Sequence, residues 1–565
     1  MKKLKSIIER IHRKINIKEL LLIFLIAQPF LDIYLKVVGE RFDIFGFSLT
    51  TLIRIAFVVF ALVYILMTRK DKKDFILIGG YLLLVCIYAI IHIYNGQNFY
   101  NNFAIGNTNG IIKELLYILR LTLPILLLYC VYKEGVNIKR ISKYISATAI
   151  IISSIIVITN IFKVSFVAYS LDYDIIDDNI FSWFSDGYEK HGYVVLTSKG
   201  WFYEANCISA VLVFTFPILL YNAMKTKKWF CYIGIQLQII AMLMLGSRTA
   251  SYGWILVYVG YMFFYLLFNA VKKRKYDYTF ISLSIAIMII SVAVLNYSPI
   301  KMRQIENEKY LAKYNENMQN KKNSDKDAEN PVNDIIYNVM YKGDNPIKYV
   351  EAVNNNLIEV SNEYSRQEVQ ELIDNNDNNG LRKYVEVEYI RNNYNDNFIS
   401  AFFINEVYPY AQDTEFWLKV LDMPFYVKSD NRGIEKLLVA RLKEKNDNFV
   451  MDTLFGLNDT ALKSRGYVVE TDFYNHYYTI GIVGIIILFG PYIIVLGYCG
   501  IKILLDIRNK FTMGNVMYGL SLLAAMAMGY LSGHLMDEYI TSLIMIYLLA
   551  SLLLNVKEQD KLEEM

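Results

Sequence analysis

The sequence contains few residues that break helices and few that could cross-link a fold. It has 9 prolines and 5 cysteines among 565 residues, and no two cysteines form a CxxC pair. A free thiol commonly packs as a small apolar group. The cysteines all stand within apolar runs, at Cys86, Cys130, Cys207, Cys231 and Cys499. This pattern disfavours a disulfide framework and a thiolate metal site.

An excess of charge of one sign is also missing. The formal net charge is +4, too small to indicate a nucleic-acid partner. Apolar residues make up 55% of the chain, and the mean hydropathy is +0.29. These residues run in uninterrupted blocks, whereas a soluble protein of this length would have a lower apolar fraction. We therefore interpret the chain as a polytopic integral membrane protein.

The apolar blocks predict the number of membrane spans. A bilayer core needs roughly 20 apolar residues per helix, and about twelve blocks approach that length. Their limits are 18–39, 46–67, 75–95, 112–132, 144–165, 201–223, 229–246, 250–270, 277–297, 474–500, 514–534 and 538–555. The predicted fold is an all-α bundle of about twelve transmembrane helices.

Lysine and arginine predict the orientation, because translocating them is unfavourable. With twelve spans, all basic clusters fall on the side of both termini, which we expect in the cytoplasm. The clusters are the N-terminal arm, Arg69–Lys73, Lys133–Lys143, Lys225–Lys228, Lys272–Lys275 and Lys502–Lys510. The intervening loops 40–45, 96–111 and 535–537 are nearly free of basic residues.

The orientation divides the chain into three parts. Residues 1–297 hold spans one to nine, and 471–565 hold spans ten to twelve with a cytoplasmic tail. Between them, 298–470 becomes rich in Asn, Asp, Glu and Lys, and we expect it to form a large, mostly helical extracytoplasmic loop. Apolar residues at helical spacing predict helices within 331–343, 346–360 and 431–445. Residues 304–330 are predicted to be flexible.

Several ionisable groups fall within or beside the outer halves of the spans. They are Asp32, Arg54, Lys113, Glu114, Arg120, Glu204 and Arg248. Charges in a membrane are costly and need a reason. One interpretation is mutual pairing or snorkelling of single side chains. The other is a basic pocket for a lipid-linked phosphate or diphosphate, since arginine forks bind phosphate oxygens bidentately.

Three stretches resemble the O-antigen ligase and polysaccharide polymerase superfamily. They are GWFYEANCISAVLVFTFPILL (200–220), LMLGSRTASYGWIL (243–256) and FGLNDTALKSRGYVVETDFYNHYYTIGIVGIIILFGPY (455–492). A large outer loop between the second and third stretches is also typical of the family. The resemblance implies a glycosyltransferase-C-like bundle. It also implies transfer or polymerisation of an undecaprenyl-diphosphate-linked glycan onto an acceptor hydroxyl, outside the cytoplasmic membrane and without a cofactor. The product would be a cell-wall polymer, capsule or exopolysaccharide.

The resemblance also implies roles for single residues. Arg248 matches the family's Ser-Arg signature and is expected to contact the diphosphate. Arg432 resembles the loop arginine that precedes a short amphipathic helix, with Arg441 as a competitor. Arg120 and Arg54 are further candidates for binding the diphosphate.

The general base is predicted from the third stretch. Many ligases of the family place a His and an Asn where this chain, eleven residues before Gly481, has Glu470. The chain thus resembles an acidic, Gram-positive-type variant. Glu470 is the first candidate for the base, and the secondary candidates at the site are Asp472, His476 and Glu204. No HExxH motif or carboxylate triplet calls for a metal.

Alternative interpretations stay open at this point. Glu470 could be a solvated acid at a helix start, and Arg248 an interfacial anchor. The whole chain could be a flippase or exporter of the lipid-linked glycan, although its halves show no clear repeat. It could also be a non-catalytic assembly protein that binds through 298–470. An elongation-type peptidoglycan polymerase is disfavoured, because no matching motif is present.

Overall fold

The computed structural model describes residues 16–33, 43–44, 47–104, 110–170, 174–185, 192–327, 371–372, 374–446, 448–467, 469–533 and 535–563. Within this part of the chain nearly all regular structure is helical. The named strands there are β1 (Asp43–Ile44) and β2 (Phe47–Ser48), which pair antiparallel just before the first long helix.

Ten helices in the described ranges are long and apolar enough to cross a membrane. They are α4 (Leu49–Arg69), α5 (Lys72–Phe103), α6 (Gly110–Glu134), α7 (Ile138–Ile161), α8 (Ala205–Thr226), α10 (Arg248–Val271), α11 (Tyr278–Leu295), α22 (Asp472–Leu505), α24 (Met513–Leu531) and α25 (Tyr539–Glu563). The remaining two expected spans fall on shorter apolar helices, α2 (Ile17–Ala27) and α9 (Trp229–Met244). The all-α, multi-pass architecture is confirmed, and the count of twelve stays a prediction.

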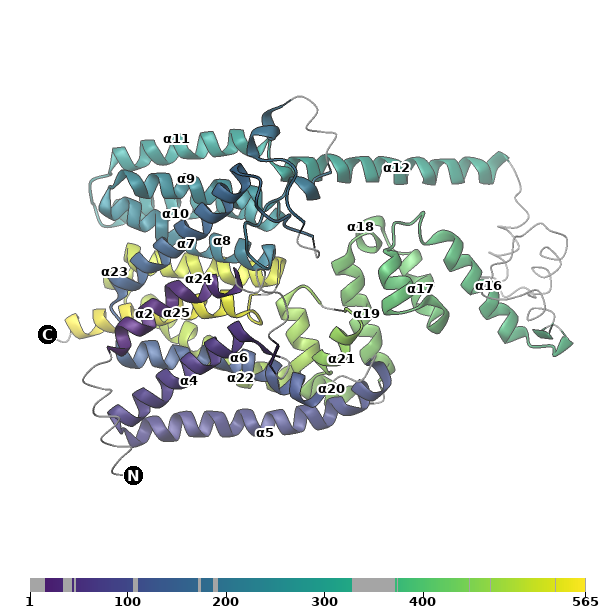
Figure 1. Ribbon diagram of the computed structural model, residues 1–565, viewed down its shortest axis with the longest axis horizontal. Helices are drawn as coiled ribbons and strands as arrows, with labels where there is room; N and C mark the ends of the chain where they lie inside the picture. The colour runs from purple at the N-terminus through teal and green to yellow at the C-terminus, as the bar shows by residue number, and fades with distance from the viewer. Residues whose placement is uncertain are drawn as a thin grey trace.

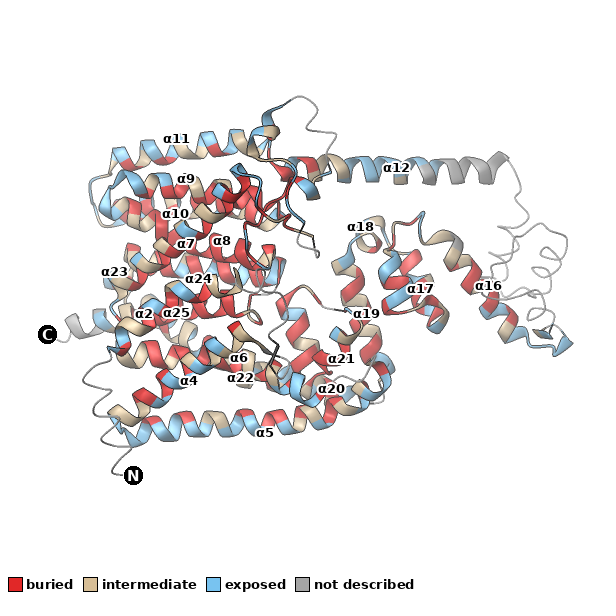
Figure 2. Cartoon of the chain, viewed as in Figure 1, coloured by how far each residue is buried: buried red, intermediate tan, exposed pale blue. Residues whose placement is uncertain are grey.

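Burial separates central helices from peripheral ones. In their most apolar windows, 83% of α8 and 89% of the α25 span are buried, against 28% of α5 and 17% of α11. A helix that is apolar all round and buried forms the core of a bundle. The outer faces of α5 and α11 expose large apolar side chains such as Ile76, Leu83 and Ile289. Figure 2 colours parts of both helices pale blue, the colour of exposed residues. These faces suit contact with lipid tails.

The polar part of the chain lies at one end of the bundle. In Figure 1, α12 (Pro299–Asp327) and α16 (Asn378–Asn393) project from the end opposite to the C-terminal end of α25. The expectation of flexibility is wrong for 304–327, which are helical; Lys, Glu and Gln, which are frequent in this segment, favour helices. Residues 328–330 and the helices predicted within 331–343 and 346–360 lie outside the described residues.

The segment before α22 forms a second apolar core, to which Phe99 and Phe103 at the end of α5 also contribute. Its further helices are η6 (Phe402–Val407), η7 (Tyr410–Gln412), α17 (Thr414–Leu421), α18 (Phe425–Lys428), α19 (Asn431–Lys445), α20 (Phe449–Phe455) and α21 (Asp459–Ser464). Trp417, Leu438, Val439 and Tyr467 are buried together in this core. The helix predicted at 431–445 is confirmed as α19. Its placement outside the membrane stays a prediction.

A buried carboxylate joins this segment to the bundle. Glu114 of α6 is fully buried and accepts hydrogen bonds from the backbone N–H groups of Asp459 (3.3 Å) and Thr460 (3.0 Å). Its Oε1 also lies 2.8 Å from Nε2 of His92 on α5. An acid at the start of a helix satisfies free N–H groups and the helix dipole. Glu114 therefore holds the start of α21 against α5 and α6, as the pairing interpretation predicts.

Two glycines allow a break inside α22. The backbone of Gly481 is non-helical, with φ +65°, and separates Asp472–Ile480 from the longer apolar part of the helix. A Cβ on Gly481 would lie 2.5 Å from the backbone nitrogen of Gly456, whose own φ is +84°. Only glycine adopts such angles readily at so close an approach. The first two turns of α22 can therefore point differently from the rest.

Candidate functional site

Arg432 and Glu470 form an ion pair at the polar end of the bundle. Nε of Arg432 donates to Oε2 of Glu470 over 2.5 Å, and the side chains are 34% and 36% exposed. Arg432 also donates to the carbonyl of Leu531, at the end of α24 (2.7 Å). The backbone N–H of Glu470 donates to the buried carboxylate of Glu435 (3.1 Å). Arg432 and Glu435 both come from α19, so this helix positions Glu470 from two sides.

The described residues between α24 and α25, 531–533 and 535–538, lie against the segment that enters α22 and are called the turn 531–538 below. Gly533 has φ +72°, and a Cβ there would collide with the carbonyl oxygen of Glu470. The buried carboxylate of Asp472 accepts from the backbone N–H groups of Leu535 (2.9 Å) and Met536 (3.0 Å). Asp472 is therefore engaged in holding this turn, while Glu470 keeps an accessible carboxylate.

Arg248 lies close to this pair. Ser247 caps α10 by accepting from the backbone N–H of Ala250 (3.1 Å), which places exposed Arg248 at the first position of the helix. The charged side chains that act on Arg248 include Arg303, Asp430 and Arg432. The structure thus brings together the predicted Arg248, Arg432 and Glu470.

The sequence interpretation missed Arg303, which belongs to the same group. It lies in the second turn of α12, and its guanidinium carbon stacks 5.1 Å from the ring centre of Tyr193. Burial raises the pKa of Tyr169 to about 12, although the neighbouring Arg303 and Arg432 oppose that shift. The charges of both arginines therefore reach the same tyrosine. Arg303 follows the predicted span 277–297 on the side of the membrane where basic residues are disfavoured, and this unusual position could have identified it.

Arg54 lies in a different setting. Its buried guanidinium donates to both carboxylate oxygens of Asp32 (2.9 and 2.8 Å) and to the carbonyl of Gln28 (2.6 Å). Its Nε donates to the Gln28 side chain (3.3 Å). This is the mutual pairing that the alternative interpretation expects. The prediction that Arg54 binds a diphosphate would require this fork to open.

Arg441 belongs to a separate cluster. It pairs with Asp413 (2.8 Å), Glu415 (3.2 Å) and Glu444 (3.3 Å), joining α17 to α19. Burial would raise the pKa of Asp413, but hydrogen bonds from Arg441, Lys445 and other donors hold it well below the usual range. Of the two competing loop arginines, Arg432 is the one beside Glu470.

Arg120 lines a polar cavity of about 360 Å³ together with Lys113 and Lys463. Its Nη1 lies 3.0 Å from Oε1 of Glu538, at the far end of the turn 531–538.

Glu204, which directly precedes α8, accepts a hydrogen bond from the thiol of Cys207 (3.1 Å). The charges of Glu204, Asp537 and Glu538 all act on that thiol. Glu204 therefore lies with the acidic residues of this turn.

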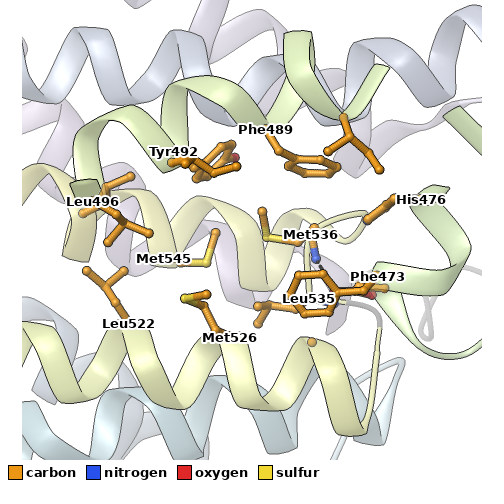
Figure 3. Close-up of a pocket in the computed structure, with 15 residues that line it drawn as sticks. Phe473, His476, Phe489, Tyr492, Leu496, Leu522, Met526, Leu535, Met536 and Met545 are labelled. Atoms are coloured by element: carbon orange, nitrogen blue, oxygen red, sulfur yellow. Dashed lines mark hydrogen bonds between the residues drawn. The ribbon is translucent and has the colours of Figure 1, made fainter. Parts of the chain in front are cut away.

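His476 lies beside an apolar cavity of about 160 Å³ between α22, α24 and α25. Figure 3 shows Phe473 and His476 at one end of this cavity and Leu496 and Leu522 at the other. Nδ1 of the buried His476 lies 3.1 Å from the hydroxyl of Tyr117, which also lines the polar cavity. The Tyr117–His476 contact therefore stands between the two cavities.

These features define a class of protein. A bundle of long apolar helices carries a polar site at one end, which holds a group of arginines and the accessible carboxylate of Glu470. An apolar cavity lies between the helices nearby. This is the architecture of a multi-pass membrane protein with a polar site. Over residues 14–559 the chain matches the family described as O-antigen ligase like membrane protein, and it belongs to that family. No curated protein and no solved structure gave a significant match.

Family membership confirms the resemblance found in the sequence. It indicates glycan transfer or ligation in the synthesis of cell-surface polysaccharide. Within the described residues, no three His, Cys, Asp or Glu side chains gather closely enough to hold a metal ion.

Proposed function

We propose that the protein transfers an undecaprenyl-diphosphate-linked glycan to an acceptor hydroxyl at the outer face of the cytoplasmic membrane. The observation that carries this proposal is the ion pair of Glu470 and Arg432 close to Arg248 and Arg303. The family to which the chain belongs supports it. The reaction serves the synthesis of a cell-surface polymer such as a capsule or exopolysaccharide.

The arginines stabilise the leaving diphosphate. Neither Arg248 nor Arg303 has an ion-pair partner among the described residues, so both forks are available to phosphate oxygens. Arg432 adds a third cation at the side of Glu470. Donors placed where negative charge develops each contribute a factor of roughly 10² to 10³ in kcat.

Glu470 serves as the general base. It accepts the proton of the acceptor hydroxyl while that oxygen bonds to the anomeric carbon, and the bond from this carbon to the diphosphate oxygen breaks. The electron pair of that bond leaves with the lipid diphosphate. Asp472 and His476 are less suited, because Asp472 already accepts two backbone N–H groups and both side chains are buried.

The apolar cavity accommodates part of the lipid carrier. Its walls include Phe489, Leu522, Met526 and Met545, and Asp472 also lines it. A long isoprenoid chain gains by lying between helices whose facing side chains are apolar. The carrier can thus place its diphosphate near the arginines while its tail stays within the membrane.

The direct test uses the purified protein in liposomes that contain lipid-linked glycan. Glu470→Gln should lower the transfer rate by roughly 10² or more, because the amide cannot accept the proton. Glu406→Gln changes an exposed acid elsewhere in the same segment and should transfer like the wild type. A rate for Glu470→Gln close to that of the control would overturn the proposed role.

A further inference from the structure

The loop between α7 and α8 lies against the Ser-Arg junction at the start of α10. The backbone N–H of Ser198 donates to the carbonyl of Met244 at the end of α9 (2.8 Å). Gly246 has φ +65°, and a Cβ there would collide with the side chain of Thr197. The loop therefore touches the chain two residues before Arg248, and its side chains can form a wall of the transfer site.

Tyr169 is held in place within this loop. The backbone N–H of Ala168 donates to the hydroxyl of Thr197 (3.2 Å), and the carbonyl of Ser170 accepts from the buried Lys199 (3.2 Å). The backbone is thus fixed on both sides of Tyr169. Its ring packs against the apolar core of the bundle. A hydroxyl carried on such a support is positioned before any substrate binds.

Tyr193 connects Tyr169 to the arginines of the site. The guanidinium carbon of Arg303 lies 5.1 Å from the ring centre of Tyr193, and the backbone N–H of Tyr193 donates to Glu306 of α12 (2.7 Å). The ring centres of Tyr169 and Tyr193 are 6.3 Å apart, with the rings tilted by 57°. Contacts therefore run from Tyr169 through Tyr193 to Arg303.

The hydroxyl of Tyr169 lies among the charges of the proposed transfer site. The charged side chains that act on it are Arg303, Arg432 and Glu470. Burial outweighs the two arginines and raises the pKa of Tyr169 to about 12, so the hydroxyl keeps its proton at neutral pH. No described residue forms a hydrogen bond with this hydroxyl. Its proton is therefore available to a ligand.

We propose that Tyr169 is a further catalytic residue, whose hydroxyl donates a hydrogen bond to an oxygen of the leaving diphosphate. This inference rests on the proposed function and adds an uncharged donor to the arginine forks. As the bond from the anomeric carbon to the diphosphate breaks, negative charge grows on the diphosphate oxygens. The hydrogen bond from Tyr169 then becomes stronger, while its proton stays on the tyrosine.

The first experiment compares Tyr169→Phe with the wild type in glycan transfer in liposomes. The substitution removes the hydroxyl and keeps the ring, so the melting temperature should not change. The lost hydrogen bond to a charged group should lower kcat roughly 10-fold to 100-fold without raising the KM for the acceptor. Tyr297→Phe removes the hydroxyl of an exposed tyrosine after α11 and should transfer like the wild type. A wild-type kcat for Tyr169→Phe would overturn the inference.

A binding measurement identifies the group that the hydroxyl contacts. The probe is inorganic pyrophosphate, titrated by calorimetry into the full-length protein in nanodiscs. Tyr169→Phe should weaken pyrophosphate binding by about fivefold or more, and Tyr297→Phe should not change it. Unchanged pyrophosphate binding in Tyr169→Phe would contradict a contact with the diphosphate. A raised KM for the acceptor would instead place the hydroxyl at the acceptor and also overturn the inference.

Glu470→Gln separates this inference from the proposed function. If Glu470→Gln loses transfer while Tyr169→Phe keeps it, the proposed function stands and the inference fails. If Glu470→Gln transfers like the wild type, the proposed role of the base fails. Pyrophosphate binding by Tyr169→Phe then still tests the contact with the diphosphate, because this measurement does not depend on transfer.

Discussion

The carboxylate of Glu470 accepts a hydrogen bond from the guanidinium of Arg432 over 2.5 Å, although the two residues are 38 positions apart. The contact joins the start of α19 to the segment that enters α22. It sets the proposed base beside a cation of the proposed diphosphate site. An arriving diphosphate can compete for Arg432 and release the carboxylate for the acceptor hydroxyl.

Arg303 should matter for transfer although it lies outside the motifs of the family. Arg303→Ala removes one of the unpaired forks and should lower kcat by roughly 10²-fold. Arg303→Lys keeps the charge but loses the fork and should retain part of the rate. Lys309→Ala on the same helix is the matched control, and the assay is glycan transfer in liposomes. Wild-type kinetics of Arg303→Ala would exclude this role.

Gly533→Ala should disrupt the turn that closes around Glu470. The new Cβ would meet the Glu470 carbonyl, and φ +72° is strained for alanine by about 1–3 kcal/mol. We expect a loss of transfer activity together with a lower melting temperature. Gly490→Ala lies in open space on α22 and should leave both unchanged. Normal activity of Gly533→Ala would show that the turn does not need this close approach.

Glu114 should be important for stability rather than for chemistry. Glu114→Ala leaves His92 and two backbone N–H groups of α21 without their buried partner. Breaking a buried pair in this way typically costs about 3–5 kcal/mol. The melting temperature in detergent should fall well below that of Glu308→Gln, an exposed control. Equal melting temperatures would contradict the anchoring role.

Asp413 should make the segment before α22 sensitive to acid. Because its pKa in the folded protein lies below the unfolded value of about 3.9, the ionised form stabilises the fold at neutral pH. That contribution is lost progressively as the pH falls from about 5 through the unfolded value toward the lower pKa of the folded protein. Proteolysis of this segment at about pH 7 and about pH 3 should show a larger change in the wild type than in Asp413→Asn. The same change in both proteins would exclude Asp413 as the source.

The sequence identified some residues of the candidate site but missed others, and it did not identify which distant residues contact each other. Arg248, Arg432 and Glu470 could be named because short motifs carry them. Glu114 was recognised as a charge that needs a partner, but two of its partners, the backbone N–H groups of Asp459 and Thr460, lie about 345 residues away and could not be identified. Arg303 was missed because nothing local shows that the start of α12 lies beside the Ser-Arg junction. The helical state of 304–327 was missed because a polar composition does not distinguish an exposed helix from a flexible chain.

The most direct test of the central claim is made in a deletion strain complemented with wild type, Arg248→Ala or Glu470→Gln. The quantity to measure is the pool of undecaprenyl-diphosphate glycan on each side of the membrane, with equal membrane abundance of the three proteins. We predict that in both variants the glycan accumulates on the outer side and that surface polymer is lost. Accumulation on the cytoplasmic side would instead indicate a flippase and contradict the proposed transferase.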